Sequence, residues 1–186
     1  MLGQQIARLT GRRPRAETTQ AQFEQVWLLH RPRIWRLVAR LAGSPDDADD
    51  LTQQVSVQAF GAFGGFRGEA QALTWLIRIA VNVVLRHRER KTHDTVALSS
   101  EHLADYPADA AHGPEARALQ SDLRPVVWAA LERLPEDLRT TLILQLYEDR
   151  KYREIADILD IPLGTVKSRL HHALRRLREE LKDYEL

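Results

Sequence analysis

Hydrophobic residues recur along most of this chain at steps of three and four, the spacing that places them on one face of an α-helix. A first helix is predicted from Ala21 to Leu41, and Pro32 is expected to kink or locally break it. A second is predicted from Pro45 to about Phe63, because Ser44 is a preferred N-cap and proline suits the first helical position. Its inward stripe should consist of Ala48, Leu51, Val55, Ala59 and Ala62.

A third helix is predicted from about Ala72 to Arg90, after a glycine-rich break at residues 63–69. The break reads FGGFRGE and lacks the GK[ST] ending of a phosphate-binding loop. The apolar positions of the helix that are expected to face the core are Leu76, Ile79, Ala80 and Val83.

The opposite face of this third helix carries Arg78, Asn82 and Arg86 at four-residue steps, with Trp75 beside them. Amide, base and aromatic groups on one face suit a surface that stacks and hydrogen-bonds exposed nucleic-acid bases. A second interpretation stays open, in which Trp75 is a core residue and the basic groups form an ordinary solvated face.

Helical patterns resume after Leu123, where Pro125 is expected in the first turn of a helix. The apolar residues predicted to face inward there are Val126, Val127, Ala130, Leu131 and Leu134. Another helix is predicted after Pro135, with its inward positions at Leu138, Leu142, Ile143 and Leu146. Residues 92–120 lack periodicity, contain prolines and are acidic, which indicates a linker.

Two short amphipathic patterns meet at a tight turn between Tyr152 and Leu181, which predicts a helix-turn-helix. Asp160 is expected to adopt left-handed geometry in the turn, and Thr165 is expected to cap the second helix. The stripe predicted for the second helix is Val166, Leu170, Leu174, Leu177 and Leu181. From Thr165 to Arg178 this helix has basic residues and no acidic ones, as expected where a phosphate backbone binds, although a solvated surface helix stays the alternative.

The overall composition excludes several classes of function. Net charge is only +1, so the case for nucleic acid rests on the local distribution of charge. The absence of cysteine excludes disulfides, thiol catalysis and cysteine-based zinc sites. His171 and His172 are adjacent, a spacing that disfavours a shared metal. We expect no catalytic residues, no metal, no cofactor, no secretion signal and no membrane span.

The patterns together predict an all-α chain with two small helical domains, at residues 21–91 and 121–186, after a flexible basic arm at 1–20. In this order the motifs resemble the extracytoplasmic-function (ECF) sigma factors of the sigma-70 family, bacterial transcription initiation factors. DADDLTQQVSVQAF is similar to region 2.2, FRGEAQALTWLIRIAVNVVLRHRERK to regions 2.3 and 2.4, and residues 131–181 to region 4.

The resemblance implies three functional surfaces. Core RNA polymerase, through its β′ clamp helices, would bind Asp46, Asp49, Asp50, Gln53 and Gln54, and its β flap would be a further contact. The single strand of the −10 promoter element would bind Phe66, Arg67, Gly68, Trp75, Arg78, Asn82, Arg86 and Arg88. The −35 element would bind Thr165, Lys167, Ser168, Arg169, His171, His172, Arg175 and Arg176.

The same resemblance implies a cytoplasmic protein held inactive by an anti-sigma factor, which can be membrane-anchored. The main alternative is a conventional helix-turn-helix regulator that binds duplex operators without polymerase. A third class, an interaction module without a nucleic-acid role, leaves the basic faces unexplained. An enzyme is the class least favoured, because no nucleophile, base and orienting group converge in the sequence.

Overall fold

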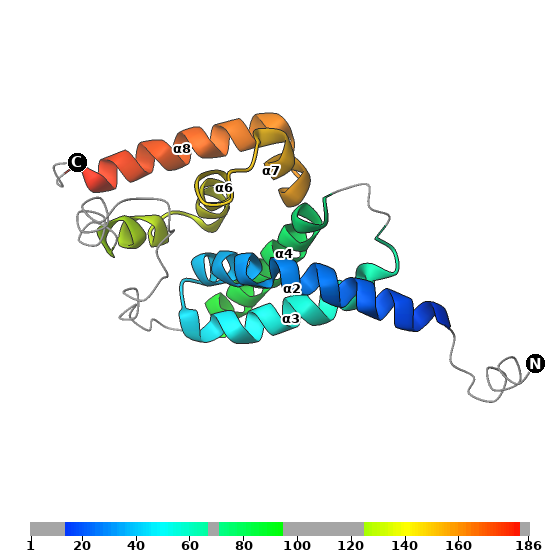
Figure 1. Ribbon diagram of the computed structural model, residues 1–186. Coiled ribbons are helices and arrows are strands. Elements are labelled where there is room, and N and C mark those ends of the chain that lie inside the picture. The colour runs from blue at the N-terminus through cyan, green and yellow to red at the C-terminus, as the bar shows by residue number, and fades with distance from the viewer. Residues whose placement is uncertain (1–13, 67–70, 95–124, 183–186) are drawn as a thin grey trace, which may run out of the picture.

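The computed structural model describes residues 14–66, 71–94 and 125–182, and all its regular elements there are helices. Three helices form the N-terminal half: α2 (Pro14–Ala42), α3 (Pro45–Phe63) and α4 (Ala72–Asp94). The C-terminal half has a helical segment at residues 125–132, followed by α6 (Glu136–Leu146), α7 (Tyr152–Leu159) and α8 (Leu163–Leu181). Figure 1 shows α2, α3 and α4 on one side of the molecule and α6, α7 and α8 on the other. The all-α prediction is confirmed.

The start of α3 follows the predicted capping chemistry. The Asp47 amide donates to Ser44 Oγ over 3.4 Å, Pro45 occupies the first turn, and the helix ends at Phe63 as expected. In contrast, α2 begins at Pro14, earlier than the predicted start at Ala21, and it continues through Pro32. The kink or break expected at Pro32 therefore does not interrupt the helix.

Gly43 makes the turn between α2 and α3. Its φ of +73° favours glycine, and its amide donates to the Ala39 carbonyl over 3.1 Å, which closes the last turn of α2. A Cβ on Gly43 would lie 2.6 Å from Glu132 Oε1 of the C-terminal half. The turn is therefore also a point where the two halves approach each other closely.

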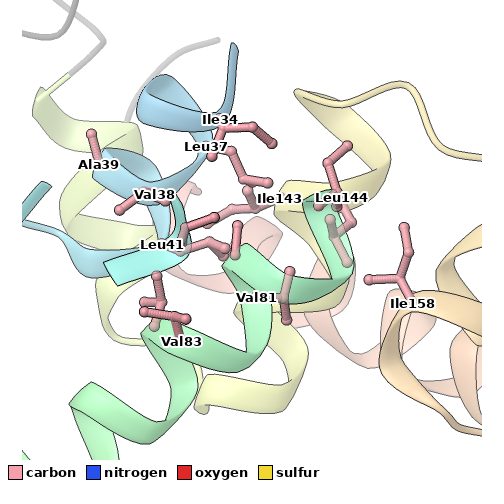
Figure 2. Packing of buried hydrophobic residues seen from close by; sticks show 14 of the residues in the cluster. Ile34, Leu37, Val38, Ala39, Leu41, Val81, Val83, Ile143, Leu144 and Ile158 are labelled. Carbon is pink, nitrogen blue, oxygen red and sulfur yellow. The ribbon is translucent and has the colours of Figure 1, made fainter. Parts of the chain in front are cut away.

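One hydrophobic core runs through both halves. Ile34, Leu37 and Leu41 of α2, Val81 of α4, and Ile143 of α6 belong to a single cluster of buried side chains. Figure 2 shows residues of α2, α4, α6 and α7 converging within this cluster. Burial of this kind contributes about 25 cal/mol for each Å² of apolar surface removed from water, so the contact between the halves stabilises the closed arrangement.

Three inward predictions are wrong, and each error has a simple physical cause. Ala62 is exposed near the C-terminal end of α3, and Phe63 takes the buried position next to it, in contact with Phe23 of α2. Leu146 is 55% exposed because it lies in the last turn of α6. Leu174 is 44% exposed, and Ala173 takes the buried position next to it in α8.

Candidate nucleic-acid interface

The helix-turn-helix forms as predicted at Asp160 but not at Thr165. Asp160 has φ 54° and ψ 48°, the left-handed conformation, and its amide donates to the Ala156 carbonyl. This sharp turn lets Ile155 and Ile158 of α7 pack against Val166 of α8. Helix α8 begins at Leu163, so the N-cap position belongs to Pro162, and the Thr165 amide donates to the Pro162 carbonyl over 2.9 Å. The prediction of Thr165 as the N-cap is therefore wrong.

The basic side of α8 is largely open to solvent. Lys167, Ser168, His171, His172, Arg175 and Arg176 are exposed. Thr165 and Arg169 are half-buried, and Arg169 pairs with Asp137 of α6 at 3.3 Å. Arg175 Nη2 lies 3.4 Å from His172 Nδ1, which keeps these two polar groups together on the same stretch of helix. A row of cations and hydrogen-bonding groups on an exposed helix can contact both phosphates and base edges in a major groove.

On α4, Arg78, Asn82 and Arg86 are exposed, as their spacing predicted. The Arg86 side chain donates to the Asn82 carbonyl over 3.1 Å and to Gln58 Oε1 of α3 over 2.8 Å. These contacts hold the guanidinium over the junction of α3 and α4. The three polar side chains therefore form one exposed strip on α4.

Trp75 and Phe66 belong to an aromatic cluster where α2, α3 and α4 meet. The ring centroids of Phe66 and Trp75 are 5.0 Å apart, and Phe63 stacks on Phe66 at 5.8 Å. Phe23 contacts both Phe60 and Phe63 edge-on. Trp75 is half-buried and packs against the core, so it takes part in packing and still presents some surface. Arg67 and Gly68 lie outside the described residues.

Arg88 does not join this strip. Its Nη1 donates to the Leu41 carbonyl over 2.7 Å, and its Nε lies 2.9 Å from Glu136 Oε2 of α6. Burial raises the pKa of the Glu136 carboxyl, while Arg88 opposes that shift. The structure thus places Arg88 between the two halves of the molecule, away from Arg78 and Asn82.

The carboxylate and amide residues of α3 that were predicted to bind polymerase, here called the acidic rim, lie on one exposed surface. Asp46, Asp49, Asp50, Gln53 and Gln54 are all exposed. Trp35 Nε1 of α2 donates to Asp49 Oδ1 over 2.8 Å. A cavity of about 380 Å³ beside them is also lined by Trp27 and Arg31 of α2. The sequence interpretation missed these three residues, although positions 27, 31 and 35 are four residues apart and so share a helix face.

The described part of the chain has neither a group of metal ligands nor a helix that could span a membrane. Within it, no three or more metal-ligating side chains are grouped so that they could hold a metal ion. None of the helices described there combines the length and the apolar character needed to cross a bilayer.

Comparisons with known proteins match two regions of the chain to one family, in the order in which the two helical halves occur. The family model described as "Sigma-70 region 2" matches residues 26–93, and "Sigma-70, region 4" matches residues 125–177. The RNA polymerase sigma-H factor of Pseudomonas aeruginosa is 32% identical over 166 residues, which are 86% of each chain. The ECF RNA polymerase sigma-E factor of Escherichia coli K12 is 34% identical over 160 residues, 83% of each chain.

Solved structures show the same fold. The sigma factor RpoE of Bartonella quintana, solved in complex with the anti-sigma factor NepR, matches with a TM-score of 0.67 and 29% identity, over 87% of this chain and 97% of that one. CnrH, solved in complex with the cytosolic domain of CnrY, matches with a TM-score of 0.63 over 91% of this chain and 94% of that one. At 21% identity, CnrH supports the fold alone. The chain therefore belongs to the ECF sigma factors of the sigma-70 family, which direct RNA polymerase to promoters and are not enzymes.

Proposed function

We propose that this sigma factor reads two promoter elements with two separate surfaces, one in each half of the chain. Residues 21–91 would form the region 2 domain, residues 121–186 the region 4 domain, and the acidic stretch at 92–120, whose first three residues still belong to α4, the linker between them. The proposal rests on one observation: the same chain has an exposed Arg78–Asn82–Arg86 strip on α4 and a separate exposed basic surface on α8.

The strip on α4 would bind the single-stranded −10 element. Asn82 can hydrogen-bond a base edge, while Arg78 neutralises phosphates and stacks. Taking a base out of the duplex costs a few kcal/mol of unstacking free energy. Contacts of this kind with the protein offset that cost. Phe66 and Trp75, together with Arg67 and Gly68, would complete a pocket for that base. Arg88 is not included in this surface, because its side chain binds the Leu41 carbonyl and Glu136.

Helix α8 would lie in the major groove of the −35 element. Lys167 and Arg175 are exposed and can reach guanine edges or phosphates, at about 1–3 kcal/mol for a good bidentate base contact. Arg169 would need to exchange its contact with Asp137 for a phosphate. Thr165, Ser168, His171, His172 and Arg176 would provide the remaining polar contacts.

The acidic rim of α3 would dock on the β′ clamp helices of core polymerase, and the region 4 domain on the β flap. Carboxylates and amides aligned on one exposed helix face suit a partner helix of opposite charge. Trp35 would hold Asp49 in place through the 2.8 Å hydrogen bond. We further propose that the chain acts in the cytoplasm and binds an anti-sigma factor, because its relative from Bartonella quintana was solved with one.

Transcription with purified bacterial core polymerase on a supercoiled genomic library, with and without the protein, tests this function. We expect promoter-specific transcripts that depend on the protein and that reveal both elements. An absence of transcripts and of binding to core, together with affinity for some duplex, would favour an operator-binding regulator. The anti-sigma proposal predicts a protein that binds the chain in competition with core polymerase.

A further inference from the structure

The turn between α6 and α7, residues 147–151, joins the C-terminal half to the N-terminal half by polar contacts. Three of its residues each reach a different partner in the N-terminal half. The Arg40 guanidinium lies 4.6 Å from the centroid of the Tyr147 ring. Glu148 pairs with Arg33 of α2, and Arg150 with Thr74 of α4.

The Arg33–Glu148 contact is the strongest of the three. Arg33 Nε lies 2.7 Å from Glu148 Oε2, and Arg33 Nη2 donates to the Glu148 carbonyl over 3.1 Å. The Glu148 side chain is only 1% exposed, whereas that of Arg33 is 40% exposed. A buried carboxylate without its cation is costly, so Glu148 fits this environment only while Arg33 covers it.

Arg150 makes the second connection. Its side chain is 7% exposed, and its Nη1 lies 3.1 Å from both Thr74 Oγ1 and Glu154 Oε1. Between the two charged residues, Asp149 has φ 49°, a left-handed conformation that is uncommon for residues other than glycine. This conformation lets Glu148 and Arg150 both turn inward from adjacent positions of a short turn.

The resulting arrangement brings the helix-turn-helix next to one end of the proposed −10 surface. Arg78 lines a cavity of about 500 Å³ together with Asp157, Asp160, Ile161 and Pro162 of the helix-turn-helix. Two acidic side chains thus line the same cavity as the basic residue proposed to contact DNA. The turn between α7 and α8 therefore lies beside Arg78 in the closed arrangement.

The closed arrangement is also too short for a promoter. Elements centred near −35 and −10 are roughly 25 base pairs apart, or about 85 Å at 3.4 Å per step. In the structure α4 packs directly against α7. Both elements can therefore be contacted at once only after the two halves have separated.

We propose that the α6–α7 turn is an intramolecular latch that holds this sigma factor closed, and that Arg33 must release Glu148 before both promoter elements can be bound. The proposal rests on the two DNA-binding surfaces given under Proposed function. The latch suits reversible opening, because its charged groups regain full hydration when the halves part. Their separation therefore costs less than that of an apolar contact of similar area.

Distance measurements on the isolated chain of 186 residues test the latch without polymerase or DNA. The sequence has no cysteine, so spin labels can be attached to Val57→Cys on α3 and Glu179→Cys on α8, both exposed positions outside the proposed binding surfaces. Double electron–electron resonance then reports the distance between the two halves. We expect one predominant short distance in the otherwise wild-type chain.

Glu148→Gln and Arg33→Gln break the latch from opposite sides. The control is Glu180→Gln, which breaks the 2.8 Å Arg133–Glu180 ion pair within the C-terminal half. We expect each latch variant to raise the ratio of long to short distances about tenfold or more, as loss of a charge-assisted hydrogen bond implies, and the control to leave it unchanged. Circular dichroism checks that the variants stay helical, and the exposed Arg33 site keeps the test open if Glu148→Gln does not fold.

Three results would overturn the latch: predominantly long distances in the wild-type chain, the same distribution in wild type and both latch variants, or short distances retained in a promoter complex with core polymerase. A change of distances in the isolated variants without any promoter-dependent transcription would instead leave the latch standing and remove the proposed DNA surfaces. The two failures are therefore distinguishable.

Discussion

At the scale of single residues, the same side-chain type has different roles according to the contacts the fold gives it. Arg78 is exposed on α4, Arg88 donates to a carbonyl of α2, and Arg139 is almost fully buried beside Glu136. The sequence shows three arginines of equal charge. Only the structure separates the arginine available to DNA from the two that bind partners within the protein.

Asn82 offers the sharpest test of the −10 surface. We expect Asn82→Ala to reduce the yield of heat-stable open complexes by about tenfold, because a bidentate contact to a base is worth about 1–3 kcal/mol. Binding to core polymerase should be unchanged. Gln20→Ala, which removes an exposed amide of α2 far along the sequence from this strip, is the control. Open complexes of normal stability in the Asn82 variant would remove this residue from the pocket.

Two leucines of α6 test the assignment of its buried face. Leu142 is fully buried and Leu146 is 55% exposed, although the periodicity predicted both to face inward. We expect Leu142→Ala to lower the free energy of unfolding by about 2–5 kcal/mol, and Leu146→Ala to change it by less than about 0.5 kcal/mol. Urea denaturation measures both values. Equal losses at the two positions would contradict the orientation of α6.

At the scale of elements, the helix-turn-helix depends on how its two helices begin and on the turn between them. Glu154 accepts a hydrogen bond from the Lys151 amide over 3.0 Å at the start of α7, and Asp160 ends that helix in left-handed geometry. Helix α8 then begins at Leu163. These local contacts fix the direction in which the basic side of α8 faces.

Removing charge from α8 should weaken the dependence of DNA binding on salt. Lys167→Gln and Arg175→Gln each delete one exposed cation, and removing a cation that neutralises one phosphate lowers the log–log slope by about 0.9. We therefore expect the slope of the double variant to fall by up to about two units on duplexes that carry the −35 element. Lys182→Gln, an exposed cation beyond the end of α8, should leave the slope unchanged. If Lys182→Gln lowers the slope as much as the double variant does, the DNA-facing part of α8 has been assigned to the wrong residues.

The start of α7 should carry a pH dependence. The Lys151 amide lowers the pKa of the Glu154 carboxyl below its ordinary value of 4.5, with a further contribution from Arg150. A lowered pKa in the folded state gives stability that is present above pH 4.5 and is lost as the pH falls through the lowered value. We expect Glu154→Gln to be less stable than wild type at pH 7, with the two curves converging in acid.

Unfolding free energies measured in urea at several pH values test this convergence. Glu179→Gln changes an exposed position of α8. Its free energy of unfolding should differ from that of wild type by the same amount at every pH. A constant difference between Glu154→Gln and wild type down to pH 3 would show that the carboxylate does not stabilise the helix start.

At the scale of the whole molecule, the two halves share a core and are also joined by polar contacts. Val81 of α4, Leu144 of α6 and Ile158 of α7 belong to one buried cluster (Figure 2). The Arg33–Glu148 pair lies at the same junction. The closed state therefore combines a non-directional apolar contact with a directional one.

This shared core predicts a single cooperative thermal transition for the wild-type chain. Calorimetric and van't Hoff enthalpies should agree, because unfolding of one half exposes the surface of the other at their shared core and so couples the two. We expect Arg33→Gln to broaden this transition or divide it in two, and Glu180→Gln to leave it single. Two resolved transitions in the wild-type chain would indicate that the halves unfold independently.

Much of the fold follows from local sequence signals, whereas the contact between the halves does not. Ser44 and Pro45 mark the start of α3, and Asp160 marks the turn before α8, because caps and turns are decided by a few neighbouring residues. The stripe predicted for α4 does not include Ile77 and Val84, which are buried in the structure. Hydrophobic periodicity identifies one face of a helix, whereas α4 is covered on two sides. Glu148 and Arg33 are separated by 115 positions, so nothing local connects them.

The burial of α6 implies that its sequence is under two opposing kinds of selection. In the closed state Ile143 and Leu144 are fully buried within a cluster that includes residues of the N-terminal half. Separation of the halves would bring part of that surface into water. More hydrophobic side chains there would make closure permanent, and more polar ones would abolish it. Evolutionary drift along α6 should therefore be confined to a narrow range of polarity, narrower than that of α8.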